Sequence, residues 1–236
     1  ILIYKQAQAG VSLLELEQQA ENFLTKHSIK GAFKWYEWFP ANLCLSVNKA
    51  LVHGIPDSYV LRDGDLLKID CGVLHKGLIS DAAVAKVIGW KSKNPAGQLL
   101  VELTKQGLDT MVESIRPWLG LYAFGNNMEN FFKKRGHSII RSLTGHGVGL
   151  QVHEAPSIYN CGHPSNKGEF FKSGMVVAIE PITAQRSVDY VEDPHNGWNL
   201  YTKQWDLGCQ WEYTVAVTDN ATEILAGVQE NLREHE

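Results

Sequence analysis

Residues 68–81, Lys68-Ile69-Asp70-Cys71-Gly72-Val73-Leu74-His75-Lys76-Gly77-Leu78-Ile79-Ser80-Asp81, predict two antiparallel strands joined by a turn. Gly77 suits a turn position that needs a positive φ. With the loop at residues 74–77, Asp70 lies opposite Asp81. Directly opposed residues have β-carbons about 4.5–5.5 Å apart, so two facing carboxylates repel unless a cation or a shared proton lies between them. A loop that differs by one residue, with one acid turned to solvent, is an open alternative.

A weak internal repeat links this hairpin to a later part of the chain. A turn at Gly64 precedes an apolar run that ends at Asp70, and a turn at Gly174 precedes an apolar run that ends at Glu180. In both copies the acid follows the turn glycine by 6 residues. Chance matches of this size are common, but a true repeat predicts two similar halves that deliver acids to one place.

Two further acids lie in apolar surroundings. Glu180 follows Val176-Val177-Ala178-Ile179 and precedes Pro181-Ile182, and Glu212 lies within the run from Cys209 to Val217. A lone buried carboxylate is strongly unfavourable. These acids therefore indicate a metal site, and an ion pair with a distant Arg or Lys is the alternative.

The stretch Thr144-Gly145-His146-Gly147-Val148-Gly149-Leu150-Gln151-Val152-His153-Glu154 combines two histidines with three glycines. One neutral imidazole and four carboxylates carry a charge of about −4, which the two divalent cations of a two-metal hydrolytic site would neutralise. The glycines would let the backbone pack tightly around such a cluster. The spacing does not decide which histidine is the ligand. In an extended strand the two rings would point to opposite faces, which predicts different roles.

Helix signals occur in three places. Ser12 and Glu15 form a predicted capping box that opens a helix over residues 12–27. A second helix is predicted from Asn94-Pro95 to the stop at Arg116-Pro117, and a third over residues 121–135. The remaining sequence has short apolar runs separated by turn residues, as is typical of an antiparallel sheet. The predicted class is α+β.

Composition narrows the range of partners. The net charge of −4 and a single tight basic run, Lys133-Lys134-Arg135, argue against nucleic acid and anionic membranes as partners. No apolar run approaches the roughly 18 residues of a membrane span. The four cysteines are widely separated and form no Cys-x-x-Cys pair, which favours reduced thiols in a cytoplasm.

Several motifs, in this order along roughly residues 10–227, resemble those of type I methionine aminopeptidases in the M24 family. They are Val52-His53-Gly54-Ile55-Pro56-Asp57, Lys68-Ile69-Asp70, Ser80-Asp81, Thr144-Gly145-His146-Gly147-Val148-Gly149, His153-Glu154-Ala155-Pro156, the segment from Gly174 to Pro181, and Gln210-Trp211-Glu212. The resemblance implies the pita-bread fold, a pseudo-twofold α+β arrangement in which a curved antiparallel sheet has helices on its outer face. It implies one metallopeptidase domain over residues 1–236, with halves at about 1–116 and 117–236.

The resemblance also implies a reaction and its residues. The implied function is removal of the N-terminal methionine from nascent polypeptides or peptides by a cytoplasmic monomer that binds two divalent ions, Co, Mn, Fe or Zn. The implied metal ligands are Asp70, Asp81, His146, Glu180 and Glu212, with Asp81 and Glu212 bridging the ions. His53 and His153 would contact the scissile peptide, and Glu180 would shuttle a proton. Without the resemblance, His53 is interpreted as a turn residue and His153 as a satisfied strand histidine.

The match loosens at the pocket for the methionine side chain. By the resemblance this pocket falls on Tyr36, Phe39, Val52, Val152 and Trp198. Members of the family often have Cys at position 52 and Phe at position 152, and residues 34–40 are bulkier here than the glycine-containing version usual in the family. Tyr213 stands where a histidine is common, and Ala82 where a threonine is common. These changes leave the implied ligands intact but affect the expected preference for methionine.

Two rival functions remain at this stage. Aminopeptidase P and prolidase share the fold and ligand set, although they usually carry a large extra N-terminal domain. The residues before the first predicted helix leave no room for one, unless the sequence is truncated at its N-terminus. The short interval between His153 and Glu180 argues against the insertion of the type II methionine enzymes. A metal-free peptide-binding relative is the other alternative, but such proteins lose ligands, and none of the five is missing here.

Overall fold

The computed structural model describes residues 2–228. Its helices are α1 (Leu2–Gln6), α2 (Leu13–Lys26), α3 (Pro95–Ser114) and α4 (Leu121–Lys133), with short 3-10 turns η1 (Tyr36–Trp38), η2 (Lys91–Lys93) and η3 (Pro164–Asn166). The strands of the first part are β1 (Lys30–Gly31), β2 (Leu43–Val47), β3 (Ala50–Val52), β4 (Leu66–His75) and β5 (Leu78–Val87). The later strands are β6 (Ser138–Ile139), β7 (Thr144–Gly147), β8 (Glu154–Tyr159), β9 (Val176–Ile179), β10 (Ile182–Ala184), β11 (Tyr190–Glu192), β12 (Leu200–Thr202), β13 (Gly208–Gln210), β14 (Tyr213–Val217) and β15 (Thr222–Ala226).

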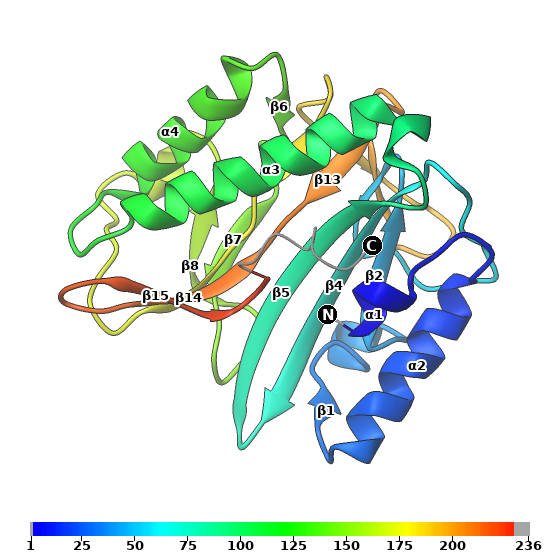
Figure 1. Cartoon of the computed structure of the whole chain (residues 1–236). Helices are drawn as coiled ribbons and strands as arrows, with labels where there is room; N and C mark the ends of the chain where they lie inside the picture. Colours follow the sequence, from blue (N-terminus) through cyan, green and yellow to red (C-terminus); the bar gives the residue numbers. More distant parts are fainter. Residues whose placement is uncertain (1, 229–236) are drawn as a thin grey trace.

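All three helices predicted from the sequence are confirmed. Ser12 caps α2 by accepting a hydrogen bond from the Glu15 amide, and the Glu15 carboxylate accepts from the Ser12 backbone, which completes the capping box. Asn94 caps α3 by accepting from the Gly97 amide. α4 ends at Lys133, two residues before the predicted end. In Figure 1, α3 and α4 lie side by side across the strands, and α2 packs beside β1 and β2.

The hairpin of β4 and β5 forms as predicted, but its predicted register is wrong. His75 pairs with Leu78, so the loop has only two residues, Lys76 and Gly77, whose φ angles are 50° and 83°. Two positive φ values are what a type I′ turn needs, and its twist matches that of the strands. Asp70 therefore pairs with Ala83 rather than with Asp81. Because the shift is two residues, both acids remain on one face of the sheet as diagonal neighbours.

The second half centres on a five-stranded sheet with the order β15-β14-β9-β7-β8. The predicted continuous strand from Cys209 to Val217 is interrupted, and β9 and β10 are separated in the same way. Ile179 pairs with Tyr213 and Ile182 pairs with Gln210, so the register continues across both interruptions. Glu180 and Glu212 consequently stand opposite each other where the ladder opens.

The internal repeat is present in the structure. Gly64 and Gly174 have φ angles of 92° and 88°, and each is followed by a strand that leads to an acid. The amide of Gly64 donates to Ile88 at the end of the partner strand, and the amide of Gly174 donates to Val217 in the equivalent place. The strands that pair with the two copies, β5 and β14, meet where Asp81 and Thr214 exchange hydrogen bonds.

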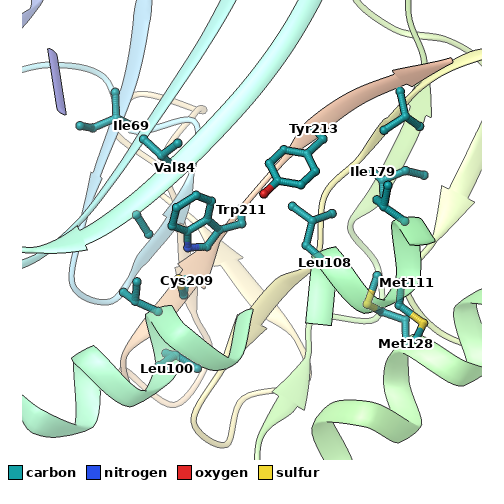
Figure 2. Close-up of a cluster of buried hydrophobic side chains, with 14 of the residues drawn as sticks. Ile69, Val84, Leu100, Leu108, Met111, Met128, Ile179, Cys209, Trp211 and Tyr213 are labelled. Atoms are coloured by element: carbon teal, nitrogen blue, oxygen red, sulfur yellow. The ribbon is translucent and has the colours of Figure 1, made fainter. Parts of the chain in front are cut away.

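One hydrophobic cluster connects residues of both halves beneath α3 and α4. Figure 2 shows the rings of Trp211 and Tyr213 in this cluster, with Val84 on one side and Met111 on the other. Tyr213 is fully buried, and its hydroxyl donates to Asp109 at 2.9 Å. Since Tyr213 follows Glu212 directly, packing of its ring into the core fixes the backbone that carries Glu212.

The loop after β10 is held by Asp206, a buried acid outside the central cluster. Its carboxylate accepts hydrogen bonds from the Arg186 amide at 2.6 Å and the Ser187 amide at 3.1 Å, and from the Ser187 hydroxyl. Burial alone would raise the pKa of Asp206, but the hydrogen bonds from Ser187 and Arg186 outweigh it and lower the pKa below 3.8.

We expect Asp206→Asn to lower the free energy of unfolding at pH 7 by about 2 kcal/mol, because hydrogen bonds to a charged acceptor are lost. A lowered folded-state pKa gives stability that is present above the unfolded value of 3.8 and is lost as the pH falls through the folded value. The gap between wild type and variant should therefore shrink below about pH 4. Urea denaturation at pH 7, 5 and 3 measures this gap. Asp219→Asn, at an exposed loop position, controls for the change in net charge, and an equal gap at all three pH values would contradict the assignment.

Within residues 2–228, no helix combines the length and hydropathy that a membrane crossing requires. All four cysteines, Cys44, Cys71, Cys161 and Cys209, are free thiols.

Candidate functional site

Acids from both halves meet at the centre of the fold. Asp81, His146 and Glu212 are buried, and each offers a ligand atom within 4.8 Å of the others. They come from β5, β7 and the interruption between β13 and β14, so the pairing of distant strands is what brings them together. The Glu212 amide donates to Ala83 at 3.0 Å and holds this residue against β5.

Glu180 joins the cluster from the interruption between β9 and β10. Its Oε1 lies 3.4 Å from Nε2 of His146, and its Oε2 accepts a hydrogen bond from Nε2 of Gln210 at 3.1 Å. Asn160 donates to its backbone carbonyl at 2.8 Å. Two hydrogen bonds therefore fix Glu180, one to its side chain and one to its backbone.

Asp70 completes the set of acids that the sequence singled out. Burial raises the pKa of Asp70 well above its usual range, and the neighbouring Asp81 and Glu180 raise it further. Burial also raises the pKa of Asp81 to about 7. Oδ1 of Asp70 and Oδ1 of Asp81 are buried without a hydrogen-bond partner among the described residues. The two facing aspartates predicted from the sequence thus lie close together despite the different register.

Glu180 and Glu212 are also buried next to other acids. Burial raises the pKa of Glu180 and of Glu212, and the charge of Asp81 adds to both. In the part of the chain that the structure describes, no lysine or arginine forms an ion pair with these acids. Lys68, which is buried two residues before Asp70, donates instead to the Asn48 carbonyl at 2.9 Å. An ion pair with a distant base, the alternative considered for these acids, is not formed within residues 2–228.

His146 presents Nε2 to the acids. Nδ1 lies 2.9 Å from the Gly147 carbonyl, so a ring protonated at Nδ1 donates to that oxygen and leaves the Nε2 lone pair free. Burial lowers the pKa of His146 to about 4, and the nearby His153 contributes, so the ring is neutral at pH 7. A methyl group at Gly145 would collide with the Ala178 carbonyl, which explains why a glycine precedes the histidine.

His53 and His153 flank the cluster from another side. The rings of His146 and His153 lie 4.4 Å apart, edge to face, so the expectation that they point to opposite faces is wrong. The chain does not continue as one strand between them, because β7 ends at Gly147 and pairs back with Glu154. Nδ1 of His153 lies 3.1 Å from the Tyr36 hydroxyl. Burial lowers the pKa of His53 to about 4.

Two cavities open onto the histidines. One, of about 120 Å³, has an apolar wall and a floor of the clustered acids. The apolar side chains in its wall are Phe33, Tyr36, Phe39, Cys44, Val152 and Trp198. Four of the five residues expected in the pocket lie here, whereas Val52 lines the other cavity, of about 500 Å³, together with Ile182 and Ser142. His53, His146, His153 and Glu180 line both cavities.

The donor set fits divalent metal ions. Four buried carboxylates and one neutral imidazole without a compensating base are unfavourable unless a cation is bound. Oxygen and imidazole nitrogen donors are the ligands that Mn, Fe, Co and Zn accept. The unpaired oxygens of Asp70 and Asp81 point to the same requirement.

Sequence reasoning missed three contributors to the site. Gln210 donates to Glu180, and its position two residues before Glu212, on the same face of a strand, was an available signal. Cys44 reaches the cavity wall because it pairs with Asp70 across the sheet. No local sequence pattern indicates this pairing. Phe33 reaches the wall through the loop after β1, also without a local signal.

Comparisons with known proteins agree on one family. The profile of Metallopeptidase family M24 matches residues 2–219. A methionine aminopeptidase of Clostridium perfringens is 36% identical over 224 residues, which cover 95% of this chain and 88% of that protein. The crystal structure of a methionine aminopeptidase from Thermotoga maritima superposes with a TM-score of 0.90 at 31% identity, covering 96% of this chain and 90% of that one.

A prolidase from Pyrococcus horikoshii superposes with a TM-score of 0.73 at 22% identity and covers 98% of this chain but 58% of its own. This likeness shows the fold alone. The predicted pita-bread architecture is confirmed by the methionine aminopeptidase structures. The chain belongs to metallopeptidase family M24 and, within it, to the methionine aminopeptidases.

Proposed function

We propose that this chain removes the N-terminal methionine from nascent polypeptides or peptides and holds two divalent ions with Asp70, Asp81, His146, Glu180 and Glu212. The observation that carries the proposal is the convergence of these five residues beside an apolar cavity, with no base to neutralise the acids within residues 2–228. We further propose a single domain over residues 1–236, which extends past the described residues at both ends, acting as a cytoplasmic monomer.

Glu180 is proposed to move the proton in the reaction. Divalent ions in such a site supply electrophilic activation, because they lower the pKa of water and polarise a carbonyl. Glu180 accepts a proton from the attacking water as the water oxygen bonds to the carbonyl carbon of methionine. It returns the proton to the amide nitrogen as the C–N bond breaks, which yields methionine and a shortened peptide. Gln210 holds Oε2 of Glu180, so the proton-accepting carboxylate keeps one orientation.

His153 and His53 are proposed to hold the scissile peptide. Both residues line both cavities, so a scissile peptide bond at the junction of the cavities lies beside both rings. The Tyr36 hydroxyl bonds Nδ1 of His153 and orients Nε2 of that ring. A ring N–H aimed at the developing oxyanion stabilises the transition state.

The smaller cavity is proposed to bind the methionine side chain. Its wall of aromatic and aliphatic side chains gives a neutral, apolar surface beside the clustered acids. Phe39 and Trp198 pack edge to face with ring centroids 5.1 Å apart, which fixes one side of the wall.

The proposal is tested by loading the purified protein with Mn, Fe, Co or Zn in turn and measuring methionine release from a Met-Ala-Ser peptide. We expect release with at least one metal and a much slower reaction with Ala-Pro and Gly-Pro peptides. Faster cleavage of X-Pro peptides would assign the chain to proline-specific activity. Absence of both activities in a protein that retains metal would overturn the proposal.

We expect His153→Ala to lower kcat by about 100-fold, because one donor to the oxyanion is lost. Tyr36→Phe, which keeps the ring and removes only the hydroxyl, should cause a smaller loss. Steady-state kinetics on Met-Ala-Ser together with metal content by elemental analysis provides the measurement. A His153→Ala protein that has full metal content and wild-type kcat would contradict the role of this histidine.

A further inference from the structure

The segment of residues 35–39, between β1 and β2, has an unusual backbone at the mouth of the smaller cavity. Trp35, Glu37 and Trp38 have φ angles of 73°, 45° and 72°. Each left-handed residue with a β-carbon costs roughly 1–2 kcal/mol, so tertiary contacts must hold this conformation. The Trp35 amide donates to the Phe39 carbonyl at 2.7 Å, and the Phe39 amide donates to the Tyr36 carbonyl at 2.8 Å.

The side chains of this segment separate into an inner and an outer set. Tyr36 bonds His153, and Phe39 is buried against Trp198, so these two residues anchor the segment to the site. Trp35 and Trp38 point outward and are 67% and 83% exposed. Large apolar rings with such exposure on an otherwise fixed loop are available for contact with a ligand.

Glu37 lies between the two exposed tryptophans and lines the smaller cavity. Its charge acts on two residues of the site. Burial raises the pKa of Tyr36, and the charge of Glu37 raises it further. Burial lowers the pKa of His153, and the charge of Glu37 offsets part of that effect. Among residues 2–228, no lysine, arginine or histidine forms an ion pair with Glu37. Lys34, the nearest cation in sequence, pairs with Glu21 at 2.9 Å instead.

Glu37 differs from the other acids of this cavity. The described acids in the wall are Glu37, Asp70, Asp81, Glu180 and Glu212. The last four belong to the proposed metal site. Glu37 is the described acid of the wall that has no role in that site. Glu37 is exposed, whereas these four acids are buried.

We propose that Glu37, flanked by Trp35 and Trp38, is a specificity-determining residue that binds a lysine or arginine side chain of the substrate downstream of the cleaved bond. The inference rests on the proposed function. The methionine side chain is neutral and the α-amine lies at the scissile carbonyl, so a cation at the rim comes from a later residue. A carboxylate binds ammonium or guanidinium groups by charge-assisted hydrogen bonds. The faces of neighbouring indoles add cation–π attraction.

The test uses peptides that begin Met-Ala-Ser and carry Lys, Gln or Glu at the third, fourth or fifth position. With the wild-type protein we expect kcat/KM to rank Lys above Gln above Glu at one of these positions, mainly through KM, with about threefold to tenfold between Lys and Gln. The preference should weaken at high salt, because the contact is exposed.

Variants of Glu37 identify the residue responsible. Glu37→Gln should remove most of the preference, since only the attraction to the indoles is left, and Glu37→Lys should rank Glu above Lys. Glu37→Gly also removes the charge, and glycine adopts a φ of 45° without steric strain, so this variant tests the proposal without adding backbone strain. Trp38→Ala should reduce the preference for Lys over Gln. Glu113→Gln, at an exposed position on α3, removes one charge away from the cavity and should leave the ranking unchanged.

The readout is a ratio of kcat/KM values within each variant, so a general loss of activity cancels. Equal kcat/KM for Lys, Gln and Glu peptides in the wild type would overturn the inference, and so would a preference of undiminished size in Glu37→Gly. Failure of the wild type to release methionine from the Gln peptides is a different result, because it would contradict the proposed function itself.

Discussion

Replacing Glu180 with glutamine is expected to lower kcat by at least about 1,000-fold, within the range assigned to the loss of a general base together with a disturbed metal site. Glutamine has nearly the same shape, so the packing of β9 and β10 should survive. A neutral amide cannot accept the proton of the attacking water. If its amide nitrogen faces Gln210, it also presents an N–H group to a donor, where the wild-type carboxylate accepts.

The measurement combines kcat, metal content and the unfolding midpoint. Glu223→Gln, at an exposed position on β15, serves as the control for loss of one charge. We expect the same collapse of turnover for Glu180→Ala and Asp70→Ala in folded proteins. Wild-type turnover in a folded Glu180→Gln protein would exclude Glu180 from the mechanism.

Metal loading is expected to reverse the effect of a substitution at Asp81. In metal-free protein, Asp81→Asn should raise the free energy of unfolding, because one of two facing buried carboxylates becomes neutral and its new amide can donate to Asp70. In metal-loaded protein the same substitution should be destabilising, since a proposed bridging ligand is lost. Wild-type protein should gain about 4 kcal/mol when the free metal concentration is 1,000 times its Kd, and the variant should gain less.

Thermal or denaturant unfolding measures the stability of the wild type and of the variant, each with chelator and with saturating metal. About 4 kcal/mol corresponds to a rise in Tm of roughly 10 °C for a chain of this size. Asp219→Asn controls for net charge. A wild-type Tm that is the same with chelator and with metal would exclude a metal ion from this cluster.

Much of the local structure could be predicted from the sequence, because the signals act over a few residues. The capping box at Ser12 and the cap at Asn94 begin their helices where predicted. The glycine turns at Gly64 and Gly174 satisfy backbone geometry that is decided within the turn itself. Apolar runs around Glu180 and Glu212 correctly indicated burial, since alternation and burial are properties of a single strand.

The register of the hairpin of β4 and β5 could not be predicted from its turn residues alone. The sequence contains a glycine at the turn, but only the twist of two ten-residue strands selects the two-residue turn with Lys76 at positive φ. The interruption of the strand at Glu212 could not be predicted from the sequence either. Nothing local opens that strand, and the break becomes visible only where it faces the break at Glu180.

The site itself belongs to the tertiary structure. Asp81 and Glu212 are remote in sequence, and they meet because β5 and the chain before β14 lie side by side, with Asp81 and Thr214 joined by two hydrogen bonds. The sequence alone determined the helices, the strand-forming runs and the acids that had to be buried, because those depend on short-range preferences and hydrophobicity. The tertiary structure decided which acids share one space, that His153 lies beside His146, and that Glu37 stands at the rim. Those relations depend on which strands pair, and pairing is settled by the packing of the whole core.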